Sequence, residues 1–197
     1  MSKLVRSAVH DGTEALLNAD ARLAEQVIAA DAEVDRLQEQ VEFQALDQLA
    51  RQQPVAGDLR VLVAALRMVA DLERMGDLAQ HVAKIARMRY PGGAIPDEMK
   101  PTIASMGAVA ERMVITIGET VELSDIERAE ALVAEDDEMD RLRRSLFHKT
   151  LSPDWKHGVE AAIDIALLGR YYERIADHTV SMAKRVIFLV TGDQPDR

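Results

Sequence analysis

The sequence predicts an all-α fold made of two three-helix units that are related by duplication. Composition is the first indication, because Ala, Leu, Val, Arg and Glu dominate while aromatic residues make up only 4%, which favours helices over strands. Repetition is the second. Residues 31–35 and 136–140 both read Asp-x-x-x-Asp, and residues 73–77 and 173–177 both read Glu-Arg-x-x-Asp. The matching segments lie 105 and 100 residues apart, so the repeat spans about half of the 197-residue chain.

The first unit is expected to contain three helices, over residues 2–18, 20–52 and 58–89. In the two longer segments apolar residues recur at alternating spacings of three and four, the period of a helix packed in a bundle. Asp20 and Asp58 are the expected N-caps of these two helices, and Pro54 with Gly57 separates them.

The second unit repeats this pattern after a linker over residues 91–97, which is rich in proline and glycine. Its helices are expected over residues 98–123, 125–151 and 158–190. Asp125 is a suitable cap for the second of them, and Gly192 is suited to end the last. The predicted domains are therefore a first bundle over 1–90, the linker over 91–97 and a second bundle over 98–197.

Charge and composition exclude several classes of function. The net charge of −10 argues against nucleic-acid binding and against direct adsorption to anionic lipid. The chain contains no cysteine, so disulfide scaffolds, zinc–thiolate sites and cysteine nucleophiles are excluded. No apolar run approaches the roughly 20 residues that span a bilayer, and the first residues do not resemble a signal peptide. We therefore expect a cytoplasmic protein.

The repeated acidic pairs are the candidate site. Two carboxylates four residues apart share one face of a helix and repel each other, so four of them on two neighbouring helices call for a cation. The candidate metal ligands are Asp31, Asp35, Glu73 and Asp77 in the first unit, and Asp136, Asp140, Glu173 and Asp177 in the second.

Two readings of these acids stay open from the residues alone. One is an ion-pair network with nearby arginines, since arginine pairs well with carboxylates; the candidates are Arg36, Arg67, Arg74, Arg141, Arg170 and Arg174. The other is an oxygen-rich metal site suited to Mg²⁺, Ca²⁺, Mn²⁺, iron or zinc. The histidines are not duplicated, so any ligation is expected to be mainly by carboxylates, although His81 extends the Glu73–Asp77 line by one turn.

The same residues resemble the PhoU family of phosphate-signalling regulators. Residues 53–60 (Gln-Pro-Val-Ala-Gly-Asp-Leu-Arg) are similar to a turn of that family, and residues 71–77 and 169–178 are similar to its repeated acidic signature. The resemblance covers essentially the whole chain. In the second unit the turn is replaced by residues 152–158. The first expected helix is short, because Met1 aligns with Met106 inside the fourth expected helix, and the resemblance implies that family members begin further upstream.

The resemblance implies two three-helix bundles with pseudo-twofold symmetry, acting as a cytoplasmic negative regulator of the phosphate-starvation response. It implies an adaptor between the ATPase of the phosphate ABC transporter and a membrane-bound sensor histidine kinase, with access to the membrane only through these partners. It also implies that multinuclear iron or zinc binds the acidic motifs. A homodimer is expected, because acidic helical bundles with exposed apolar edges often dimerise.

Two other functions compete with this reading. A carboxylate-bridged di-iron enzyme of the ferritin-like class would need a Glu-x-x-His motif, which the chain lacks. A metal-free helical scaffold would need only the arginine pairs. No catalytic residue is expected.

Overall fold

A computed structural model shows six helices joined by short turns, described over residues 1–192 except for the side chain of Ala134. The helices are α1 (Ser2–Asn18), α2 (Ala21–Gln52), α3 (Gly57–Arg89), α4 (Lys100–Leu123), α5 (Ile126–Thr150) and α6 (Gly158–Thr191). The all-α prediction is confirmed, and each helix begins and ends within two residues of its predicted bounds. None of the described helices is long and apolar enough to cross a membrane.

Helix caps show why the boundaries fall where they do. The Asp20 carboxylate accepts a hydrogen bond from the Leu23 amide at 2.9 Å, and Asp125 does the same for Arg128 at 3.1 Å, so both predicted caps are confirmed. The predicted cap at Asp58 is wrong. Helix α3 already begins at Gly57, so Asp58 lies in the first turn, where a carboxylate still favours the positive end of the helix dipole. Gly192 ends α6 with a φ of 80°, as expected.

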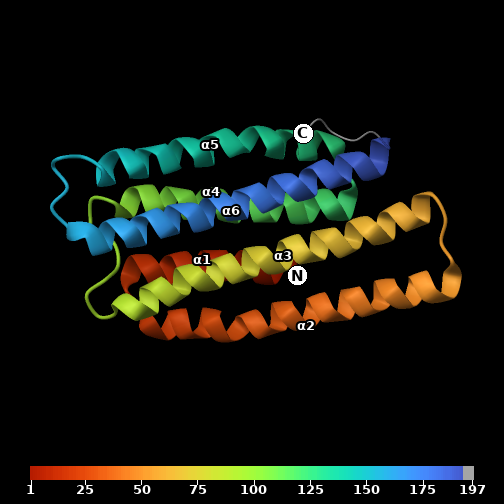
Figure 1. The fold of residues 1–197 in the computed structure, drawn as a ribbon, viewed down its shortest axis with the longest axis horizontal. Coiled ribbons are helices and arrows are strands. Elements are labelled where there is room, and N and C mark those ends of the chain that lie inside the picture. Colours follow the sequence, from red (N-terminus) through yellow and green to blue (C-terminus); the bar gives the residue numbers. More distant parts are fainter. Residues whose placement is uncertain (193–197) are drawn as a thin grey trace.

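The arrangement of the helices follows the duplication. Helix α2 lies against α3, and α5 lies against α6; α1 and α4 pack on these two hairpins. Between the units, α3 contacts α6 and α1 contacts α4, so each of these pairs joins two copies of the same helix. Figure 1 shows the resulting elongated bundle, with the α2–α3 hairpin reaching beyond the end of α6. This pairing is the pseudo-twofold relationship that the resemblance implied.

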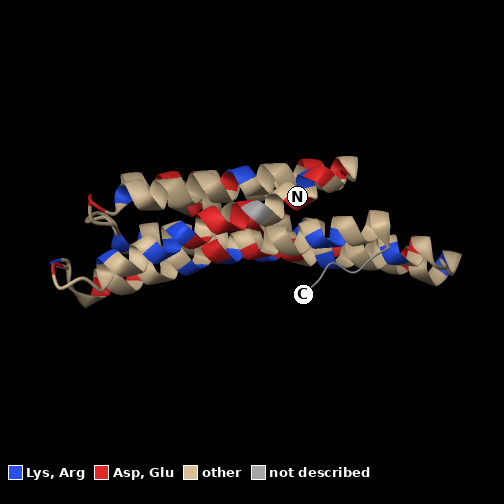
Figure 2. Ribbon diagram, turned by 90° about the horizontal axis from the view of Figure 1, so that it is seen from above, with Lys and Arg blue, Asp and Glu red and all other residues tan. Residues whose placement is uncertain are grey.

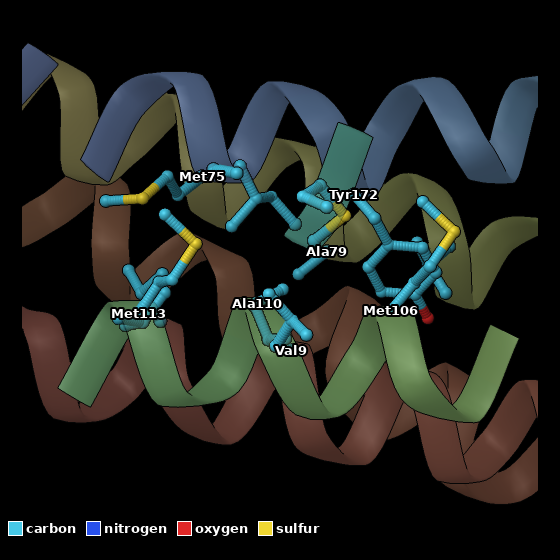
Figure 3. Packing of buried hydrophobic residues seen from close by; sticks show 14 of the residues in the cluster. Val9, Met75, Ala79, Met106, Ala110, Met113 and Tyr172 are labelled. Atoms are coloured by element: carbon cyan, nitrogen blue, oxygen red, sulfur yellow. The ribbon is translucent and has the colours of Figure 1, made fainter. Parts of the chain in front are cut away.

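One hydrophobic core runs through both units. The buried cluster includes residues from all six helices. Figure 3 shows part of it, with Met75 and Met113 on one side of Ala79 and Ala110, and Met106 beside Tyr172 on the other. The division of the chain into domains over 1–90 and 98–197, with a linker over 91–97, stays a prediction. Residues 193–197 lie outside the described part.

Close contact between α1 and α4 depends on a glycine. A Cβ atom at Gly107 would lie 2.5 Å from Cγ2 and 2.7 Å from Oγ1 of Thr13. The Thr13 hydroxyl donates to the carbonyl of Val9 at 2.7 Å and lies 2.8 Å from the hydroxyl of Tyr172. A buried polar pair that joins α1 to α6 is thus satisfied within the core.

Candidate functional site

The first acidic cluster consists of Asp31 and Asp35 on α2 and of Glu73 and Asp77 on α3. Because these helices are neighbours, their acidic faces meet. Asp31 is buried, with 8% of its surface exposed, while Glu73 and Asp77 are half-buried and Asp35 is exposed. Gly76 permits this approach, since a Cβ atom there would lie 3.1 Å from Oδ1 of Asp31.

The first cluster is short of positive charge. The pKa of Asp31 is raised to about 6, chiefly by burial and then by the neighbouring carboxylates of Asp35 and Asp77. Burial likewise raises the pKa of Glu73, followed by the charge of Asp77, whereas Arg74 lowers it. Arg74 lies 3.3 Å from Asp77 and 3.6 Å from Glu73, and its own side chain is largely exposed. An exposed arginine at these distances only partly offsets four converging carboxylates.

The second acidic cluster consists of Asp136, Asp140, Glu173 and Asp177 on α5 and α6. Burial raises the pKa of Asp136, and the charges of Asp177 and Asp140 add to it; burial and then Glu173 raise the pKa of Asp177. The four acids therefore also converge across two helices. Figure 2 shows a concentration of acidic residues at mid-length of the bundle, with others spread along the helices.

Arginine makes the two clusters unequal. The carboxylate of Glu173, which is 9% exposed, pairs with Arg143 at 3.0 Å and with Arg170. The corresponding positions in the first unit, obtained by subtracting 105 and 100, hold Gln38 and Ala70. The second cluster therefore already contains two cations that the first one lacks.

The predicted arginine network is found only in part. Arg74 and Arg170 pair with acids of the clusters, but Arg36 pairs with Glu33 instead. Among the residues that the structure describes, Arg67, Arg141 and Arg174 have no carboxylate within 4.0 Å of a side-chain nitrogen. Arg143 was not anticipated.

The donor chemistry of the clusters fits a hard or borderline metal ion, because carboxylates with raised pKa values gain from a bound cation. In the described part of the chain, no three Asp, Glu or His side chains lie in an arrangement that could hold a metal as they stand. His81, on the same face as the first cluster, donates from Nδ1 to the carbonyl of Asp77 at 2.6 Å and packs against Tyr171. Its Nε2 atom is the nitrogen left for another partner.

A polar contact between the units lies outside the residues that the repeated acidic motifs identify. Asp71 on α3 accepts a hydrogen bond from Nδ1 of His178 at 2.9 Å and pairs with Arg185 at 3.2 Å, both on α6. The periodicity contains a signal for it, because Asp71 lies three residues after Met68 and four before Met75 on the core stripe of α3. A carboxylate at such a position is buried and requires partners.

Comparison with known proteins agrees with the duplicated helical fold. The family model described as "PhoU domain" matches residues 1–86 and 103–186, so one copy of the match falls on each three-helix unit. The chain belongs to the PhoU family.

Relatives within the PhoU family share nearly the full length of the chain. It is 49% identical over 195 residues to the phosphate-specific transport system accessory protein PhoU homolog 2 of Mycobacterium tuberculosis, covering 99% of this chain and 92% of that one. It is 46% identical to PhoU homolog 1 of Mycobacterium leprae, covering 100% and 88%. The crystal structure of PhoU from Pseudomonas aeruginosa matches with a TM-score of 0.90 and 29% identity over 98% of this chain and 93% of that one.

Proposed function

We propose that this chain is a cytoplasmic negative regulator of the phosphate-starvation response and of phosphate uptake. Its membership of the PhoU family is the observation that carries the proposal, because the relatives named above are accessory proteins of the phosphate-specific transport system. The chain would act by binding other proteins rather than by turnover. The partners proposed are the ATPase of the phosphate ABC transporter and a sensor histidine kinase.

Deletion of the gene tests this role. Phosphate-uptake genes should be derepressed in phosphate-rich medium, and a plasmid copy of the wild-type gene should restore repression. A deletion strain with normal repression would contradict the proposal. Homodimer formation is part of the proposal and is tested separately by sedimentation equilibrium of the purified chain.

We further propose that the acidic clusters bind iron or zinc. Asp31, Asp35, Glu73 and Asp77 would hold the ion in the first unit, and Asp136, Asp140, Glu173 and Asp177 in the second. A bound cation would supply positive charge that holds the paired helices together. Without a cation, the carboxylates of each cluster repel one another. Each cluster is therefore expected to bind a cation.

Elemental analysis of protein purified without chelator tests the metal proposal directly. Bound iron or zinc should fall when Glu73 and Asp77 are changed together to Gln and Asn. A metal-free protein would favour the scaffold reading. Oxygen-dependent turnover of added ferrous iron would instead favour a di-iron enzyme.

A further inference from the structure

An apolar groove of about 270 Å³ lies between the beginning of α3 and the end of α6, near the point where the α2–α3 hairpin reaches past α6 (Figure 1). Leu59, Val63 and Ala64 from α3 and Phe188 from α6 form its apolar lining. Leu59 and Val63 are 41% and 40% exposed. Contiguous exposed apolar side chains on helix faces commonly mark binding surfaces.

Three arginines line this α3–α6 groove, on a chain whose net charge is −10. Arg185 is engaged with Asp71 at 3.2 Å. Arg60 lies over the ring of Phe188, with its guanidinium carbon 5.9 Å from the ring centre. Within the part of the chain that the structure describes, neither Arg60 nor Arg67 has a carboxylate partner, and the groove has no acidic lining residue. The groove is therefore a basic site on an acidic protein.

The duplicated position in the second unit is chemically different. Adding 100 to Arg60 and Ala64 gives Glu160 and Asp164 at the beginning of α6. There Arg89, from the end of α3, pairs with Asp164 at 2.6 Å and also with Glu160. One of the two pseudo-symmetric junctions of α3 and α6 is thus closed by ion pairs within the chain. At the other junction, Arg60 and Arg67 have no carboxylate partner among the residues that the structure describes.

We propose that the α3–α6 groove binds an acidic amphipathic helix of a partner protein. Such a helix would pack apolar side chains on Leu59, Val63 and Phe188, and its carboxylates would pair with Arg60 and Arg67. At the other junction, the corresponding acids come from the chain itself. This deepens the proposed regulatory function and rests on it, since it assigns the surface through which the chain contacts a partner.

Charge and shape disfavour the other occupants. In a twofold dimer formed through the groove, Arg60 and Arg67 of the two copies would face each other, and none of the described lining residues is acidic. An anionic bilayer would be repelled by the net charge of the chain. Inorganic phosphate would satisfy the arginines but would leave the apolar lining exposed to water.

Fluorescence anisotropy with a designed probe tests the proposal. The probe is a labelled helical peptide of about five turns, with leucines spaced three and four residues apart and flanked by glutamates. The full-length chain should bind it, and Arg60→Glu with Arg67→Glu should weaken binding by about tenfold or more. Arg22→Glu with Arg144→Glu is the matched control, because both residues are exposed and change the net charge equally. Its affinity should stay within about twofold of the wild type.

Several results would overturn the proposal. Equal binding by the Arg60/Arg67 variant, no binding by the wild type, or equal binding of a lysine-flanked peptide would each do so. Displacement of the peptide by millimolar inorganic phosphate, but not by chloride at the same ionic strength, would make the groove an anion site. Loss of a dimer in the Arg60/Arg67 variant would make it a self-interface. Circular dichroism of each variant checks that it is folded. Derepression in the deletion strain without peptide binding would reject the groove and leave the proposed function standing.

Discussion

Asp71 and His178 form a hydrogen bond of 2.9 Å across the junction of the two three-helix units. The positions related to them by duplication hold Tyr171 and Leu78, so this polar contact occurs on one side of the pseudo-twofold axis and not on the other. Arg185 forms an ion pair with the same carboxylate at 3.2 Å.

Asp71→Ala is expected to lower the free energy of unfolding by about 2 to 4 kcal/mol. The change removes a buried carboxylate and leaves His178 and Arg185 without their partner. Urea unfolding followed by circular dichroism measures the loss. Asp47→Ala is the control, because Asp47 pairs with Arg51 at the surface and should cost no more than about 0.5 kcal/mol. Equal effects of the two changes would contradict the assignment.

Gly107→Ala is expected to destabilise the fold by about 1 to 3 kcal/mol, because the added methyl group would overlap Thr13. Gly57→Ala is the matched control. A Cβ atom at Gly57 meets nothing within 4 Å, and Gly57 lies in the first turn of α3, so alanine there should be neutral or stabilising by up to about 1 kcal/mol. Thermal unfolding of both variants checks the prediction, which fails if Gly107→Ala is as stable as the wild type.

The first acidic cluster should hold metal more tightly than the second, because Arg143 and Arg170 already neutralise Glu173. Glu73→Gln with Asp77→Asn should therefore remove more bound metal than Glu173→Gln with Asp177→Asn. Elemental analysis of the two variants, purified in parallel, measures the difference. A larger loss from the second pair would show that the arginines do not compete with metal.

The metal-free protein should lose stability as pH rises. The folded-state pKa of Asp31 is raised to about 6, first by burial and then by Asp35 and Asp77. A group whose pKa is raised on folding stabilises the fold below its unfolded pKa, about 4 for aspartate, and loses that contribution as pH rises through the folded value. Asp31 should thus contribute about 1 to 3 kcal/mol less at pH 7 than at pH 4. Chelator-treated wild type and Asp31→Asn, unfolded in urea across this range, give the comparison. The variant should show a smaller dependence on pH, and identical profiles would contradict the assignment.

The helices were predictable because their signals are local. Apolar periodicity, the caps at Asp20 and Asp125, and the glycine at 192 place nearly every boundary. The prediction of Asp58 as an N-cap was wrong because a carboxylate is favourable both at the N-cap and in the first turn of a helix. Only the backbone conformation distinguishes the two positions.

The candidate site was predictable in its acids but not in its cations. Duplication identifies the eight carboxylates, and helix pairing within each unit follows from short turns. Arginine side chains are long, so the acid with which each one pairs depends on packing. Arg36 pairs with Glu33 on its own helix, and Arg143 pairs with Glu173 on the neighbouring helix. The contact between Asp71 and His178 spans 107 residues of sequence; the local periodicity indicates that Asp71 is buried but does not identify its partner.

The ion pairs of Arg89 with Asp164 and Glu160 make the two ends of the molecule different as binding surfaces. Two identical halves related by a twofold axis would present the same face at both ends, and a binding protein would attach in either of two equivalent directions. Here one end is closed by its own ion pairs, while at the other end Arg60 and Arg67 have no carboxylate partner within the described residues 1–192. The fused chain therefore has a polarity that a symmetric pair of bundles lacks, and a complex that recognises this difference forms in a single orientation.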